Sequence, residues 1–138
     1  MDRFLLDTNV VSEARKGGRA DPGVRTWLAS VRGSQLYLSV LVVGEIRQGV
    51  ERLQRRDPAQ SRVFESWLET LEHTYGDRMV PITADIADHW GRLNVPDPLP
   101  DIDGLMAATA QARRMVLVTR NAVDVERTGV EVLNPFSS

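Results

Sequence analysis

Short apolar runs alternate along this chain with longer segments of helical pattern. Each run is too brief for a helix and is rich in branched or aromatic residues, as strands are. The runs are Phe4–Leu6, Gln35–Ser39, Met79–Ile82, Met115–Thr119 and Val130–Leu133. Parallel strands need a crossover connection, usually a helix, so this order predicts a three-layer α/β/α domain with a mainly parallel central sheet. We expect residues 1–138 to form this single domain.

Capping residues mark where the helices begin and end. Pro after Asp, or a Ser or Thr before a periodic apolar segment, is typical of a helix start. The predicted helices run from Pro22 to Val31, from the Ser39 cap to about Arg55, from Pro58 to near Gly76, and from the Thr83 cap to about Leu93. The segment VPDPLPD at 95–101 holds three prolines, so it predicts a loop, with Asp101 capping the next helix.

Composition excludes several classes of protein. The 138 residues, 42% of them apolar, suffice for one core, and no disulfide or thiolate metal site is available without cysteine. No targeting signal is visible and no apolar stretch reaches the ~18 residues of a membrane span, so we expect a cytoplasmic protein without membrane contact. The net charge of −2 means that any contact with nucleic acid must be local.

Four acidic residues stand where a surface carboxylate is not expected. Asp7 follows the apolar run FLL, Glu45 interrupts LVVGEI at the border of a buried helix face, Asp103 begins DGLMAATA, and Asp124 closes TRNAVD. Each also has a structural interpretation: a cap or Asx turn for Asp7 and Asp124, a helix-dipole contact for Asp103, and a border position reaching water for Glu45. Ligands of parallel α/β sheets bind beyond the carboxyl ends of the strands, so we expect the four at one edge.

Clustered carboxylates without Cys or His ligands favour a hard cation, Mg²⁺ or Mn²⁺, and phosphate chemistry. Two other mechanisms compete with this hypothesis. His73 and His89 would suit a metal-independent mechanism of phosphodiester cleavage that transfers protons through imidazoles. A phosphatase with Asp7 as nucleophile would want a second Asp two residues on, where the chain has Asn9.

Three separated motifs, FLLDTNVVSE, LSVLVVGEIRQGV and DIDGLMAATAQARRMVLVTRNAVDVERTGVEVLNPF, resemble the PIN-domain family. More narrowly, they resemble the VapC-type and FitB-like toxins of bacterial toxin–antitoxin pairs. The resemblance implies a PIN-like fold and a metal-dependent endoribonuclease that leaves 5′-phosphate and 3′-hydroxyl ends. It assigns the three core acidic positions to Asp7, Glu45 and Asp103, and the more variable fourth to Asp124.

The resemblance also implies supporting residues and partners. Asn9 and Thr119 match polar residues flanking the family's site, and Arg120 and Asn121 belong to the same TRN motif. The implied partners are RNA, a small DNA-binding antitoxin of VapB or FitA type, and a second copy in a homodimer within a larger assembly. Gly104 and Val125 depart from the family's usual bulkier and aromatic residues. A non-catalytic RNA- or protein-binding module on the same fold is the alternative, but such a module would be expected to have lost acidic positions.

Overall fold

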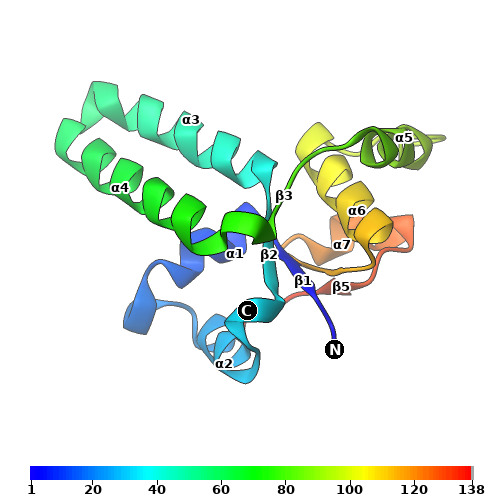
Figure 1. The fold of residues 1–138 in the computed structure, drawn as a ribbon, viewed down its shortest axis with the longest axis horizontal. Helices are drawn as coiled ribbons and strands as arrows, with labels where there is room; N and C mark the ends of the chain where they lie inside the picture. Colours follow the sequence, from blue (N-terminus) through cyan, green and yellow to red (C-terminus); the bar gives the residue numbers. More distant parts are fainter. Residues whose placement is uncertain (138) are drawn as a thin grey trace.

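The computed structural model describes residues 1–137 and shows a five-stranded, wholly parallel sheet in the order β3-β2-β1-β4-β5. The strands are β1 (Phe4–Leu6), β2 (Leu36–Ser39), β3 (Met79–Val80), β4 (Val116–Val118) and β5 (Val132–Leu133). The three-layer prediction is confirmed, since helices flank this sheet (Figure 1). The predicted runs were correct in place but one or two residues too long at several ends.

The helices begin and end close to the predicted boundaries. They are α1 (Thr8–Ala14), α2 (Pro22–Ser30), α3 (Val40–Arg56), α4 (Pro58–Tyr75), α5 (Ala84–Leu93), α6 (Asp101–Arg113) and α7 (Ala122–Val125), with short 3-10 turns at Gly17–Arg19, Gly33–Gln35, Gly76–Arg78 and Glu126–Thr128. Helices α3 and α4 pack along each other as a hairpin on one side of the molecule, and α5 packs along α6 on the other (Figure 1). None of the helices within residues 1–137 is both long and apolar enough to span a bilayer.

Side-chain caps account for most of the helix starts. Asp21, Ser39 and Asp57 each accept a backbone N–H in the first turn of the helix that follows. Thr83 occupies the predicted cap position of α5, but its hydroxyl bonds the Asp85 carboxylate rather than the backbone. The sequence therefore locates helix starts well, because a cap is a local interaction.

The predicted cap at Asp101 was wrong. Pro100 occupies the cap position of α6, and its carbonyl accepts the N–H of Gly104 at 2.9 Å. Proline has the fixed φ that suits this extended position, so the helix begins one residue earlier than expected. Asp101 lies in the first turn, where the helix dipole stabilises a carboxylate.

The core lies where the sheet meets the helices around it. Leu5, Leu38, Leu117 and Val118 are almost completely buried on the central strands, and Met106 and Ala107 of α6 belong to the same cluster. Burial of each large apolar side chain contributes about 1.5–3 kcal/mol. This packing holds the carboxyl ends of β1 and β4 rigidly beside each other.

Candidate active site

Asp7 follows β1 at the point where the order of the sheet reverses direction. From β1 the chain builds β2 and β3 to one side, then β4 and β5 to the other, so the carboxyl ends of β1 and β4 flank the switch point. Leu6 pairs with Val118, which places the next residues, Asp7 and Thr119, side by side. The Asp7 N–H donates to the Val118 carbonyl at 2.9 Å, so this edge is fixed by the backbone.

A buried polar network fixes the Asp7 carboxylate. Its Oδ1 accepts the N–H of Thr8 at 2.7 Å as the cap of α1, and its Oδ2 accepts the Thr119 hydroxyl at 2.7 Å. Asn9 Nδ2 also reaches Oδ2, at 3.4 Å, while Asn9 Oδ1 accepts the N–H of Arg120 at 3.2 Å. The structural and functional interpretations of Asp7 are thus compatible, because capping leaves lone pairs on a carboxylate held in one orientation.

Glu45 lies in the second turn of α3, which begins directly after β2. Its Oε1 accepts the Thr8 hydroxyl at 2.5 Å, linking α3 to the first residue of α1. Sequence reasoning missed Thr8 as a site residue. The signal was its position inside the DTN motif, where a hydroxyl next to Asp7 can reach a second carboxylate.

Asp103 is half-buried in the first turn of α6, and its surroundings differ from those of Asp7 and Glu45. Its carboxylate accepts no hydrogen bond from residues 1–137. Burial raises the pKa of Asp103, and the negative charges of Asp7, Asp124 and Glu45 raise it further. Asp7, Glu45 and Asp124 therefore all lie within electrostatic reach of Asp103, at the edge of the sheet where the four carboxylates were predicted.

The fourth acid and the remaining supporting residues lie at the start of α7. Asp124 is exposed in that short helix, and Asn121, at its N-cap position, donates its backbone N–H to the Thr119 hydroxyl at 3.0 Å. Arg120 contributes its backbone N–H to Asn9, while its guanidinium lies 4.6 Å from the ring centre of Phe136. These residues support the site mainly through the backbone of the TRN segment.

Packing explains why this chain has Gly104 where the family usually has a bulkier residue. A Cβ at Gly104 would lie 3.1 Å from Nε1 and 3.2 Å from Cδ1 of Trp90, so the indole of α5 occupies the space that a larger side chain would fill. Trp90 Nε1 is buried and has no hydrogen-bond partner within residues 1–137. The sequence could not connect Trp90 with Gly104, because the two residues lie on different helices.

The donor set suits a hard cation in its chemistry. The acidic side chains offer carboxylate oxygens, which Mg²⁺ and Mn²⁺ prefer. In this conformation no three acidic or His side chains of residues 1–137 are drawn closely enough together to hold one ion. The carboxylates of Asp7 and Glu45 are held by threonine hydroxyls, and their coupling to Asp103 is electrostatic.

The two histidines lie outside this arrangement. His89 Nε2 is 2.7 Å from Gln111 Oε1, and Gln111 lies eight residues beyond Asp103 along α6, a rise of about 12 Å. His73 is exposed in the last turn of α4. Neither imidazole is placed to share a proton transfer with the acidic residues.

Comparison with known proteins agrees with this geometry. The PIN domain family model matches residues 4–129. The chain belongs to the PIN-domain family. Its relatives include a VapC ribonuclease, Y4jK, of Sinorhizobium fredii, 30% identical over 96% of this chain and 97% of that one. Toxin FitB of Neisseria gonorrhoeae is 29% identical, with 96% and 98% coverage.

Solved structures place the same PIN fold over almost the whole chain. The crystal structure of FitAcB from Neisseria gonorrhoeae superposes with a TM-score of 0.86, at 28% identity and with 96% of this chain and 97% of that one covered. DNA-bound VapBC from Salmonella typhimurium has a TM-score of 0.78 at 20% identity, with 98% of this chain and 99% of that one covered, which shows the shared fold. The resemblance predicted from the sequence motifs is confirmed.

Proposed function

We propose that this PIN domain is the toxin of a toxin–antitoxin pair and acts as a metal-dependent endoribonuclease. The observation that supports this most directly is the Asp103 carboxylate, which is half-buried, accepts no hydrogen bond from residues 1–137 and lies within electrostatic reach of three other carboxylates. Such an arrangement is unfavourable unless a cation compensates it. The names of the relatives, a VapC ribonuclease and the toxin FitB, support the same assignment.

Asp7, Glu45 and Asp103 would hold Mg²⁺ or Mn²⁺, with Asp124 holding a second ion or its water shell. When bound, the ion supplies an activated water and neutralises charge in phosphodiester hydrolysis, leaving 5′-phosphate and 3′-hydroxyl ends. Thr119 and Asn9 keep Asp7 in one orientation, and Thr8 does the same for Glu45 Oε1, which leaves Glu45 Oε2 for water or ion. This fixed polar environment reduces reorganisation during the reaction.

The decisive experiment compares Asp103→Asn with Asp101→Asn. Both positions lie in the first turn of α6, but Asp101 is exposed and outside the acidic site. We expect RNA cleavage by wild type and Asp101→Asn in Mn²⁺, loss of cleavage in EDTA, and no cleavage by Asp103→Asn. Saturating Mn²⁺ at a hundredfold excess over its Kd should stabilise wild type by about 2.7 kcal/mol and Asp103→Asn much less. Cleavage that persists in EDTA and disappears in His89→Ala would contradict the metal mechanism.

The proposed partners follow the same assignment. The FitAcB and VapBC structures are those of toxin–antitoxin complexes, and VapBC is bound to DNA in the Salmonella structure. By this similarity, a short DNA-binding antitoxin of FitA or VapB type covers the acidic site and restrains the nuclease in the cell. An antitoxin gene beside this one, and suppression of growth arrest by its product, would test the pairing.

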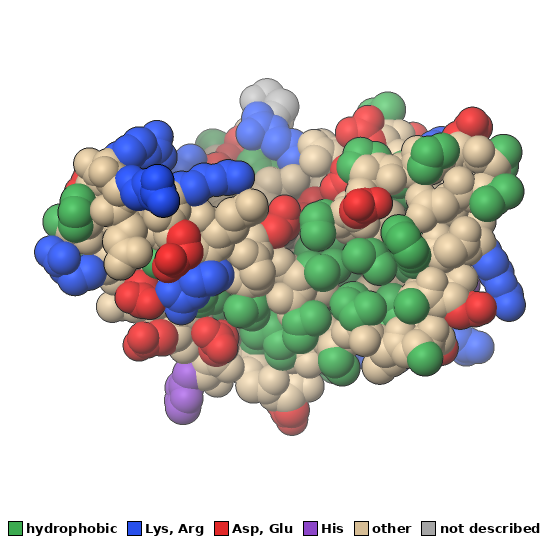
Figure 2. All heavy atoms as spheres, turned by 90° about the horizontal axis from the view of Figure 1, so that it is seen from above, with side chains coloured by type: hydrophobic (Ala, Val, Ile, Leu, Met, Phe, Trp, Pro, Cys, Tyr) green, Lys and Arg blue, Asp and Glu red, His purple; other side chains and the backbone are tan. Residues whose placement is uncertain are grey.

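We also propose that two copies pair through the apolar surface beside the acidic site. Val40, Val43 and Met79 line one hollow, and Leu41 and Ile102 line the next one beside Glu45. Figure 2 shows apolar side chains gathered across the middle of this face, between the α3–α4 hairpin and α5. A two-fold axis would set identical apolar surfaces against each other.

A charge in this surface tests the dimer. Val40 is 37% exposed and Val63, on the outer side of α4, is 53% exposed. We expect Val40→Glu to sediment as a monomer and Val63→Glu to sediment as wild type. A dimer of undiminished stability in Val40→Glu would exclude this surface.

A further inference from the structure

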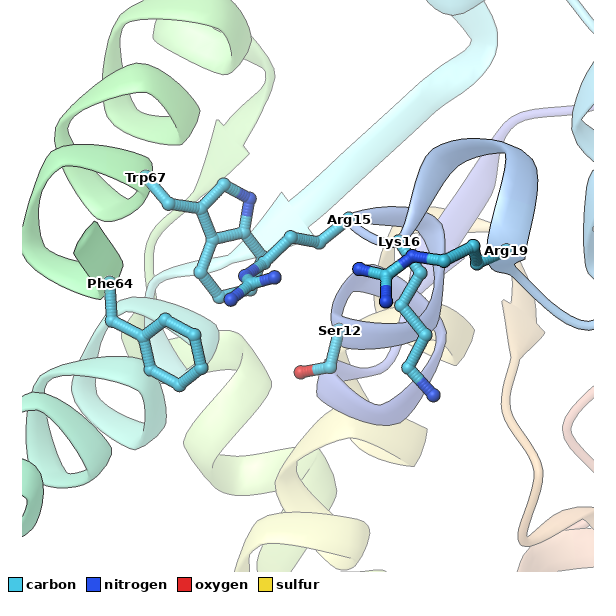
Figure 3. Close-up of a pocket in the computed structure, with 6 residues that line it drawn as sticks. All are labelled: Ser12, Arg15, Lys16, Arg19, Phe64 and Trp67. Carbon is cyan, nitrogen blue, oxygen red and sulfur yellow. The ribbon is translucent and has the colours of Figure 1, made fainter. Parts of the chain in front are cut away.

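A groove separate from the acidic site lies between the end of α1 and helix α4. Its lining is basic on one wall and aromatic on the other, without an acidic residue: Ser12, Arg15, Lys16, Arg19, Phe64 and Trp67. Figure 3 shows the Ser12 hydroxyl directed into the space between the helices, with Arg15 extending toward the two rings. The groove combines cations with flat aromatic surfaces, the two elements of single-stranded nucleic-acid sites.

One face of α1 connects this groove to the acidic site. Thr8, Ser12 and Arg15 follow at intervals of four and three residues, so they lie along one side of the helix. Thr8 bonds Glu45 at one end, and Ser12 and Arg15 line the groove at the other. From Asp7 to Arg15 the helix rises about 12 Å, a distance that a short single strand leaving the acidic site can cover.

The cations of the groove are largely uncompensated. Neither Arg15 nor Arg19 forms an ion pair with a carboxylate of residues 1–137, whereas Lys16 pairs with Glu13 at 3.0 Å. The Arg15 guanidinium lies 4.3 Å from the ring centre of Phe64 and 5.6 Å from that of Trp67. A planar guanidinium over aromatic rings forms a surface on which an unpaired base can stack.

We propose that this groove binds single-stranded RNA next to the scissile phosphate. Arg15 and Arg19 contact backbone phosphates, Lys16 adds positive charge, and one base stacks against Phe64 or Trp67. This inference rests on the proposed ribonuclease function and adds a second contact region for its substrate. It also explains how a chain with net charge −2 holds RNA, because the binding charge is local.

Salt dependence of binding tests the phosphate contacts. We would measure the affinity of a short fluorescein-labelled single-stranded RNA of mixed sequence in EDTA, by anisotropy, across a series of salt concentrations. The slope of log K against log salt concentration is negative, and each lost phosphate contact makes it shallower by about 0.7. Arg15→Gln and Arg19→Gln should each show this decrease. The control is Arg92→Gln, because Arg92 is an exposed arginine on α5, outside the groove.

Ring substitutions test the stacking contact. Trp67→Leu should weaken RNA binding on the order of tenfold, while Trp67→Phe, which keeps an aromatic face, should retain most of the affinity. In cleavage assays with Mn²⁺, the weaker RNA binding of Trp67→Leu should raise KM and leave kcat nearly unchanged. Trp67 also packs against the core, so thermal melts of both variants establish that each is folded before binding is compared.

The outcomes separate this inference from the proposed function. If wild type cleaves RNA but the salt slopes of Arg15→Gln and Arg19→Gln are unchanged, the proposal that the groove binds RNA is wrong, while the proposed ribonuclease function stands. The groove would then be a binding surface for a protein partner. RNA that binds only when Mn²⁺ is present would also overturn the proposal that the groove binds RNA. A wild-type protein that neither binds nor cleaves RNA would overturn both proposals.

Discussion

At the scale of single residues, neutral polar side chains determine how the acidic residues are presented. Thr119 is almost fully buried, donates its only hydroxyl proton to Asp7 and accepts the N–H of Asn121. Thr8 plays the corresponding part for Glu45. A carboxylate fixed in this way does not need to reorient when a cation or substrate arrives.

Thr119→Val should therefore weaken both stability and metal binding. The substitution keeps the shape but removes the donor to Asp7 and the acceptor of the Asn121 N–H, a loss of about 1–3 kcal/mol. Thr119→Ser keeps the hydroxyl and serves as the control. Denaturant unfolding and Mn²⁺ titration of both variants measure the effect, and equal behaviour of Val and Ser would show that the hydroxyl is not important.

Asp103→Asn should make the metal-free protein more stable at neutral pH. The folded-state pKa of Asp103 is raised above 3.8 by burial and by the charges of Asp7, Asp124 and Glu45, so folding favours its protonated form. Stability contributed by that proton is present at low pH and is lost as pH rises from the unfolded pKa through the raised folded pKa. The advantage of Asp103→Asn should thus be largest at neutral pH.

Unfolding free energies of wild type and Asp103→Asn in EDTA, measured at a series of pH values, check this prediction. The difference should vanish below the ordinary pKa of an aspartate, where wild-type Asp103 is neutral in both states. A difference that grows as the pH falls would mean that Asp103 is stabilised as a carboxylate, contrary to its surroundings.

At the scale of elements, α6 packs closely against α5 because Gly104 has no side chain. Trp90 of α5 packs against Gly104, directly after Asp103, and so sets how closely the two helices approach. The small residues of DGLMAATA allow α6 to pack closely, but the packing partner could not be predicted from the sequence, because it lies on another helix. Capping residues, by contrast, act within a few positions and were predictable.

Gly104→Ala should destabilise the protein by about 1 kcal/mol, although alanine favours helix. The added methyl would lie 3.1 Å from Nε1 and 3.2 Å from Cδ1 of the Trp90 indole, and this overpacking outweighs the gain in helix propensity. Gly49→Ala in α3 is the matched control, since a Cβ there meets no atom within 4 Å; it should stabilise by up to about 1 kcal/mol. The thermal unfolding midpoint should be lower than that of wild type in Gly104→Ala and higher in Gly49→Ala.

At the scale of the whole molecule, the order of the strands explains why acidic residues distant in the sequence come within electrostatic reach of Asp103. Asp7 follows β1, whereas Glu45, Asp103 and Asp124 lie in α3, α6 and α7, and the reversal of the sheet at β1 and β4 brings those elements to one edge. Strand–helix alternation predicted this edge, since parallel connections bring successive carboxyl ends to the same side. The DTN and TRN motifs contain Thr8 and Thr119, but the carboxylates that their hydroxyls orient, those of Glu45 and Asp7, lie far away in the sequence, so these pairings could not be predicted.

From the same arrangement we expect the acidic site to bind a cationic side chain of the antitoxin. An arginine could pair bidentately with two of the four carboxylates and replace the charge of the metal without its chemistry, while an apolar segment covers neighbouring helix surface. Binding of antitoxin and of Mn²⁺ should then compete. Calorimetric affinity for the cognate antitoxin should fall as Mn²⁺ is raised, and Asp103→Asn should weaken both ligands. An affinity independent of Mn²⁺, with RNA cleavage continuing in the complex, would mean that inhibition acts away from Asp103 and its neighbours.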